Sequence, residues 1–183
     1  MRKSHAFPAI PGIEFRDELG RGAHTVVYRG RRDGRDVSIK IQEATPRAED
    51  ALRFRREAAL LACLRHPALP TVLACGEHEG RQWLALDYAE GRSLAEVLAE
   101  GALAEERIVA IARDLAGALA EVHGHGLVHR DVKPANVLIT PRDGARLIDF
   151  GLAMRLRGEE WPGEVAGTFL YAAPEQTGLL KRQ

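Results

Sequence analysis

Alternating apolar and polar residues predict several strands, most clearly in the first half of the chain. Val37, Ile39 and Ile41 alternate with Ser38 and Lys40, which is the period-two pattern of a strand with one buried face. The other face of this strand carries Ser38 and Lys40 together. Similar runs predict further strands, separated by turns, over 14–43, 71–77, 81–87, 137–140 and 145–148.

Helical spacing of apolar residues is evident in two longer segments and one short one. Over 47–65, Phe54, Leu61 and Leu64 form one stripe, and Glu57 lies one turn before Leu61. The segment is expected to end at the His-Pro pair that follows, because the residue before a proline avoids helical conformation.

The second half of the chain is dominated by helical patterns. Ser93 is expected to cap a short helix reaching Ala99, because Glu96 stands at the capping-box position. The clearest helix covers 105–123 and is stopped by the glycines that follow. Its apolar repeat consists of Ile108, Ile111, Leu115, Leu119 and Val122. The pattern predicts an α+β protein of two lobes, with a cleft that suits a nucleotide.

Composition argues against several classes of protein. Lys and Arg together number 26, as do Asp and Glu, so the formal charge is zero, whereas a general nucleic-acid binder carries a basic excess. No apolar run reaches the roughly 18 residues of a membrane-spanning helix. We therefore expect a cytoplasmic protein, in which Cys63 and Cys75, both among apolar neighbours, are small reduced side chains of the core.

Basic charge is carried almost entirely by arginine. The chain has only four lysines, and asparagine occurs once. A chain with this bias keeps a lysine or an asparagine mainly where no other residue will serve. Lys40, Lys133 and Asn136 are therefore candidates for chemistry.

A glycine-rich segment, Gly20-x-Gly22-x-x-Thr25-x-Val27, joins two predicted strands. Glycines in such a turn let backbone N–H groups approach phosphate oxygens, although a merely flexible hairpin has the same composition. Lys40, on the next strand, requires an anion. Triphosphate oxygens would serve, and a structural ion pair with the Glu57 carboxylate is the alternative.

The segment His129-Arg130-Asp131-Val132-Lys133-Pro134-Ala135-Asn136 carries the strongest signal. Its carboxylate, ammonium group and amide oxygen fall within six residues. Phosphoryl transfer needs a base, a neutralising cation and a metal ligand close together, because its catalysis is mostly positioning and charge neutralisation. Asp149-Phe150-Gly151 follows a predicted strand and adds a carboxylate for Mg²⁺, which prefers oxygen ligands.

With these motifs in this order, the sequence resembles the protein kinase superfamily, and more narrowly the bacterial serine/threonine kinases of eukaryotic type. The resemblance covers about residues 13–183. It implies a leader over 1–12, an antiparallel-sheet lobe with one helix over 13–88, and an incomplete, mainly helical lobe over 89–183. The motifs are the 20–27 segment, Val37-Ser38-Ile39-Lys40, Glu57, the 129–136 segment, Asp149-Phe150-Gly151 and Ala173-Pro174-Glu175.

The resemblance implies transfer of the γ-phosphate of ATP, with Mg²⁺, to a serine or threonine hydroxyl of a protein. Asp131 would orient that hydroxyl and accept its proton, and Lys133 would neutralise the transferring group. Lys40, paired with Glu57, would hold the α- and β-phosphates. Mg²⁺ would be held by Asn136 and Asp149, and ATP by Gly20, Gly22, Val27, Lys40, Asp87, Ala89 and Leu138.

Two departures from the family pattern concern ATP and regulation. Thr25 and Ser38 replace a glycine and an alanine, from which we expect altered ATP affinity. No Ser, Thr or Tyr occurs over 152–166, so the usual phosphate acceptor is missing, although Arg130 is present to receive an anion. We expect a carboxylate to pair with Arg130 permanently. Thr168 or Tyr171 would be other phosphate acceptors, and a solvated acidic loop with an unused Arg130 is the alternative. The carboxylates are Glu159, Glu160 and Glu164.

The family's catalytic domain continues for roughly another hundred residues, so the chain is expected to be a piece of a longer protein that folds poorly alone. The 174–178 run resembles signalling proteins in which ATPase and sensor modules follow a kinase. The alternatives are an ATP-binding, pseudokinase-like scaffold, an inactive fragment, and a small-molecule kinase of the aminoglycoside type. Zinc binding by His123, His125 and His129 lacks a completing ligand.

Overall fold

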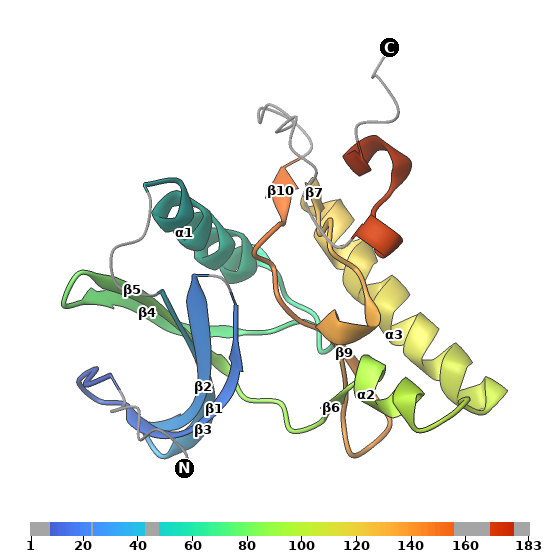
Figure 1. Ribbon diagram of the computed structural model, residues 1–183, viewed down its shortest axis with the longest axis horizontal. Coiled ribbons are helices and arrows are strands. Elements are labelled where there is room, and N and C mark those ends of the chain that lie inside the picture. The colour runs from blue at the N-terminus through green and yellow to red at the C-terminus, as the bar shows by residue number, and fades with distance from the viewer. Residues whose placement is uncertain (1–7, 23, 43–47, 156–168, 178–183) are drawn as a thin grey trace. The chain divides into compact units, whose positions relative to one another are not determined.

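The computed structural model describes residues 8–22, 24–42, 48–155 and 169–177 (Figure 1). The chain divides into two compact units by its internal contacts. Unit 1 consists of Met1–Ala58 and Val72–Tyr88, and unit 2 of Ala59–Thr71 and Ala89–Gln183. The connector of residues 64–71 therefore belongs to unit 2, although the strand that follows it belongs to unit 1.

Unit 1 contains an antiparallel five-stranded sheet in the order β1-β2-β3-β5-β4. Two of its hairpins turn at Asp33-Gly34 and at Glu79-Gly80, where both residues of each pair have positive φ. Turns of this hand match the twist of the flanking strands, and the second is the turn that the sequence predicts. The strands are β1 (Glu14–Arg21), β2 (Thr25–Arg32), β3 (Arg35–Gln42), β4 (Val72–His78) and β5 (Arg81–Asp87).

The alternation in β3 separates a core face from a partly exposed face. Val37, Ile39 and Ile41 are 1%, 0% and 3% exposed, and apolar residues of β2 pack with them in one cluster. Full burial of such a side chain contributes about 1.5–3 kcal/mol. Because successive side chains point to opposite faces, Ser38 and Lys40 lie together on the other face and stay partly exposed.

Helix α1 (Ala48–Cys63) carries the stripe predicted for this segment. Phe54, Glu57 and Leu61 are buried at successive turns, and Leu64 is buried directly after the helix ends. Glu57 is thus a buried carboxylate in an apolar row. The helix begins in unit 1, and its last turn from Ala59 onward belongs to unit 2.

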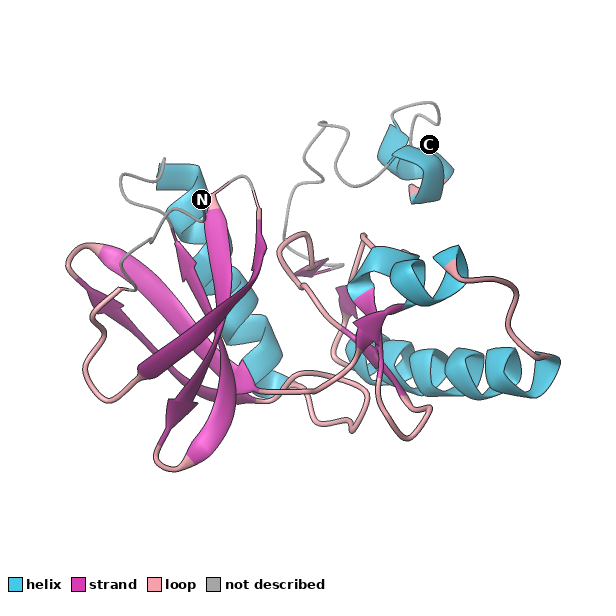
Figure 2. Cartoon of the chain, turned by 60° about the horizontal axis from the view of Figure 1, so that its bottom comes forward, coloured by secondary structure: helices cyan, strands magenta, loops and turns pink. Residues whose placement is uncertain are grey.

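Unit 2 is organised around the long helix α3 (Glu105–Gly124), which packs against β7 (Leu127–Val128) and β9 (Ala145–Leu147) (Figure 2). Helix α2 (Leu94–Ala99) begins with the predicted capping box, in which Ser93 and Glu96 bond to each other's backbone N–H. The remaining elements are β6 (Arg92–Ser93), β8 (Val137–Ile139), β10 (Met154–Arg155) and three 3-10 turns, η1 (Pro134–Asn136), η2 (Phe169–Tyr171) and η3 (Pro174–Thr177).

Hydrogen bonds attach the 64–71 connector to the rest of unit 2. Arg65 N donates to Glu121 Oε1 of α3 at 2.9 Å, and Leu147 N of β9 donates to Ala68 O at 2.9 Å. Gly117 of α3 lies against His66: a Cβ at Gly117 would stand 2.8 Å from His66 Nε2. The glycine is therefore required by a close approach of the connector to the helix.

Three residues, Cys63, Cys75 and Ile108, are more exposed than expected. Cys63 and Cys75 are exposed thiols rather than core side chains, because Cys63 ends α1 away from the buried stripe and Cys75 lies on the edge strand β4. Ile108 opens the apolar repeat of α3 but is 51% exposed.

No helix in the described part of the chain combines the length and apolar composition needed to cross a membrane.

Candidate active site

Lys40 and Glu57 form a nearly dry ion pair in unit 1. Both oxygens of the Glu57 carboxylate lie 2.8 Å from Lys40 Nζ, and the two side chains are 12% and 5% exposed. Removing two charges from water is costly and is offset only by good geometry. The carboxylate from α1 thereby fixes the ammonium group of β3 in one place, as the sequence expectation requires.

The glycine-rich segment is the turn between β1 and β2. Gly22 N donates to Thr25 O at 2.8 Å, and Gly20 pairs with Val27 across the hairpin next to a register shift. A Cβ at Gly20 would meet no described atom within 4 Å. Packing against the described residues therefore leaves room for a side chain at Gly20.

Asp131 is the centre of a compact polar network in unit 2. Its Oδ2 lies 2.7 Å from Lys133 Nζ and accepts a hydrogen bond of 2.7 Å from Asn136 Nδ2. The same amide nitrogen donates to the Asp131 carbonyl at 2.9 Å. Both hydrogens of the Asn136 amide therefore face Asp131, and its Oδ1 accepts no hydrogen bond from a described residue. An amide oxygen of this kind is a ligand type that hard cations accept.

Asp149 reaches the same place through the β8–β9 hairpin. Ile148 N donates to Asn136 O at 2.8 Å, directly beyond the pairing of Val137 with Leu147, so Asp149 follows at the same end of the hairpin. Its backbone is left-handed, with φ of 64°, and its carboxylate is exposed. The structure thus brings Asp131 and Asn136 into contact and places Asp149 directly after a residue whose backbone bonds to Asn136.

His129 contacts both Phe150 and the backbone of Asp131. Its buried ring packs edge-on against Phe150, with centroids 4.5 Å apart, and its Nδ1 accepts a hydrogen bond from Asp131 N at 3.3 Å. Burial lowers the pKa of this imidazole, although the carboxylates of Asp149 and Asp131 act in the opposite direction. The neutral ring is the form that can accept this bond, so His129 orients the Asp131 backbone.

The remaining residues expected to contact ATP lie in both units, and each is described within its own unit. Asp87 ends β5 opposite Val37 of β3, and the partly exposed Val27 lies opposite Lys40. In unit 2, Leu138 points away from the buried face of β8, and Ala89 is partly buried. Thr168, together with Glu159, Glu160 and Glu164, lies outside the described residues.

Sequence reasoning missed Gln176, which lies in η3 and donates from Nε2 to the carbonyl oxygen of Arg130 at 2.8 Å. Its position after Ala173-Pro174-Glu175 was the available signal. Arg130 itself has a left-handed backbone, with φ of 68°. The contact joins two segments 46 residues apart, and no local pattern encodes it.

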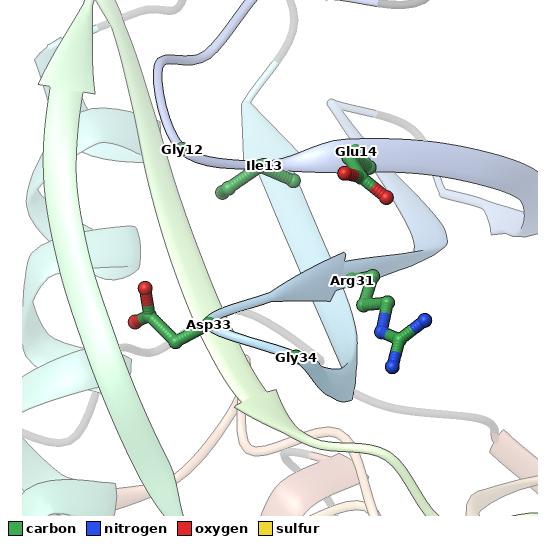
Figure 3. A pocket seen from close by; sticks show the side chains of 6 residues that line it. All are labelled: Gly12, Ile13, Glu14, Arg31, Asp33 and Gly34. Carbon is green, nitrogen blue, oxygen red and sulfur yellow. The ribbon is translucent and has the colours of Figure 1, made fainter.

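Unit 1 also has a surface depression. It has a volume of about 390 Å³ and is lined by residues of the β1 start and the β2–β3 turn: Gly12, Ile13, Glu14, Arg31, Asp33 and Gly34 (Figure 3). Arg31 lies six residues along β2 from Thr25, which is roughly 20 Å of strand. The depression is therefore at the opposite end of β2 from the glycine-rich turn.

Comparison with known proteins agrees with this constellation. The protein kinase domain family matches residues 13–182. Serine/threonine-protein kinase pkn2 of Myxococcus xanthus is 37% identical over 170 residues, which are 86% of this chain and 20% of that protein. PknB of Mycolicibacterium smegmatis is 35% identical over 176 residues, 89% of this chain and 28% of that protein. PknL of Mycobacterium bovis is 37% identical over 166 residues, 87% of this chain and 42% of that protein.

The chain thus spans less than half the length of these relatives. All three are named serine/threonine-protein kinases. The match extends over nearly the whole chain, from the strand before the glycine-rich turn to beyond Ala173-Pro174-Glu175, and includes both sets of polar residues described above. The chain therefore belongs to the protein kinase family.

Proposed function

We propose that this chain provides ATP binding and phosphoryl transfer in a serine/threonine protein kinase that acts on protein substrates. The observation that carries the proposal is the Asp131 carboxylate, held within 2.7 Å of both Lys133 Nζ and Asn136 Nδ2. A carboxylate, a cation and a metal-ligating amide in mutual contact are the groups that this reaction requires. The names of the relatives add the substrate class.

The polar groups of unit 2 fit a magnesium ion. Asn136 Oδ1 is left as an acceptor by the orientation of its amide, and the exposed Asp149 adds a carboxylate. Hard cations of this kind take oxygen ligands. When bound, Mg²⁺ supplies neutralisation of the phosphate charge, and we assign its protein ligands to Asn136 and Asp149.

Each protein group then has one task. Asp131 orients the attacking hydroxyl and takes its proton as the hydroxyl oxygen bonds to the γ-phosphorus and the bond to the bridging oxygen breaks. Lys133 neutralises the charge on the transferring group, and Lys40, fixed by Glu57, holds the α- and β-phosphates. Positioning and charge neutralisation of this kind supply most of the rate enhancement.

We assign the remaining ATP contacts to Gly20, Gly22, Val27, Asp87, Ala89 and Leu138. A place in signal transduction, a cytoplasmic location and fusion to further modules belong to the same proposal. We also propose that an acidic residue is permanently paired with Arg130. Phosphorylation at Thr168 then does not switch activity. If phosphopeptide mapping found phosphate at Thr168 and activity required it, this last point would be contradicted.

The test is transfer of ³²P from [γ-³²P]ATP to a panel of unstructured proteins, followed by phosphoamino acid analysis. We expect label on serine or threonine, and loss of about 10³-fold or more in kcat for Asp131→Asn, because that amide cannot accept the proton. The variant should still bind Mg-ATP. Wild-type protein that binds Mg-ATP but transfers no label to any protein would instead indicate a scaffold.

A further inference from the structure

Gln176 is a buried amide that uses both of its ends. The residue is 7% exposed, its Oε1 accepts a hydrogen bond from Ala173 N at 3.2 Å, and its Nε2 donates to Arg130 O at 2.8 Å. A backbone N–H needs an acceptor and a backbone carbonyl needs a donor, so the two partners fix which end of the amide points where. A carboxylate in this position has no donor for Arg130.

The peptide group between Arg130 and Asp131 is held at both of its polar atoms. Its carbonyl, from Arg130, accepts from Gln176, and its N–H, from Asp131, donates to His129 Nδ1. Arg130 also has a left-handed backbone, with φ of 68°. Such a conformation costs on the order of 1–3 kcal/mol in a non-glycine residue and persists where the surroundings impose it.

The orientation of this peptide group determines where the Asp131 side chain begins. Among the described residues, the partners of Asp131 are His129, Lys133 and Asn136, which all lie within five residues of it in sequence. Gln176 contacts this peptide group from a distant segment, 46 residues after Arg130. The η3 turn is thereby tied to the residue proposed as the base.

We propose that Gln176 is a positioning residue for phosphoryl transfer, which holds the Arg130–Asp131 peptide group so that the Asp131 carboxylate meets the substrate hydroxyl. This inference rests on the proposed function. Displacing a reacting group by about 1 Å costs roughly a hundredfold in rate. Loss of the Gln176 contact should therefore reduce kcat, while the groups that bind Mg-ATP remain in place.

The test compares Gln176→Met, which keeps the size and loses both hydrogen bonds, with Gln176→Glu in the natural full-length protein. Mg-ATP binding stoichiometry is measured first, and kcat is expressed per binding site, so that unfolded protein does not count. We expect both variants to lose about tenfold to a hundredfold in kcat at pH 8, with the KM for ATP within about twofold of wild type. Gln82→Met, in β5, is the matched control and should keep wild-type kcat.

Gln176→Glu adds a second measurement, the pH dependence of kcat, which would not change if Gln176 had only a structural role. A protonated carboxyl donates from its O–H and accepts at its carbonyl, which is the pattern of the lost amide. The kcat of this variant relative to wild type should therefore recover at least threefold as the pH falls from 8 to 5.5, whereas the ratio for Gln176→Met stays flat. Wild-type kcat per site in both variants, or equal pH dependence of the two ratios, overturns the positioning role. Absence of transfer by the wild type refutes the proposed function instead.

Discussion

The side chains of Lys40 and Glu57 form an ion pair that is costly to bury. Both are almost completely removed from water and contact each other at 2.8 Å. A pair of this kind contributes little net stability compared with apolar side chains of the same size, but breaking it leaves one charge without its partner. We infer that the pair is kept for the placement of the ammonium group.

Variants of Lys40 and Glu57 should separate the effect of the ion pair on stability from its effect on phosphoryl transfer. Glu57→Ala should lower the free energy of unfolding by about 3 kcal/mol, because the Lys40 charge loses its carboxylate in a poorly hydrated place. The double variant Lys40→Met/Glu57→Leu should regain most of this loss and yet show no phosphoryl transfer. Urea denaturation measures the first result and the ³²P assay the second. A double variant as unstable as the single one would show that the pair itself stabilises the unit.

Among the elements, helix α3 shows the effect of a single missing side chain. Gly117 lies under His66, whose Nδ1 accepts from Ala68 N at 3.1 Å, and Ala68 O in turn accepts from Leu147 N at 2.9 Å. The imidazole is thus held in place by the connector. A side chain at position 117 can enter only if that connector moves.

Gly117→Ala should therefore destabilise the protein, although alanine favours helix. The added Cβ would stand 2.8 Å from His66 Nε2, and overpacking of this kind costs about 1–3 kcal/mol. Gly124→Ala in the same helix is the matched control. A Cβ there meets no described atom within 4 Å, and the change should stabilise by about 0.5 kcal/mol. Thermal denaturation of both variants checks the opposite signs, and a gain at both positions would refute the packing argument.

The sequence predicted those elements whose cause is local. The Ser93–Glu96 capping box, the Glu79-Gly80 turn and the alternation in β3 each depend on residues a few positions apart. The motifs that we propose for catalysis are also local, because 129–136 and 149–151 each contain their polar groups within a short segment. The sequence predicted neither the Gln176 contact to Arg130 nor the exposure of the cysteines and Ile108. These depend on which distant segments cover a residue, and local periodicity contains no such information.

At the scale of the whole molecule, the residues that we assign to ATP come from distant parts of the sequence. Lys40 and the glycine-rich turn belong to unit 1, and the Asp131, Asn136 and Asp149 set belongs to unit 2. A ligand that binds only the folded protein raises its apparent stability by an amount set by its concentration and its affinity. Changes in either unit should therefore reduce the same stabilisation.

Mg-ATP at a hundredfold excess over its Kd should stabilise the wild-type protein by about 2.7 kcal/mol. Lys40→Met in unit 1 and Asp149→Ala in unit 2 should each remove most of this shift, and EDTA should do the same in the wild type. Arg113→Met removes an exposed cation of α3 and serves as the control that keeps the full shift. Differential scanning fluorimetry measures all four, and an undiminished shift in either of the first two variants would contradict the assignment of that residue to Mg-ATP.

The exposed thiols give this chain a natural pair of labelling positions. The sequence contains two cysteines, both are accessible, and the unit boundaries assign Cys75 to unit 1 and Cys63 to unit 2. Maleimide dyes or nitroxides would therefore attach once to each unit without any engineered cysteine. Energy transfer or dipolar spectroscopy on the doubly labelled chain can then follow how the distance between the end of α1 and strand β4 responds to nucleotide.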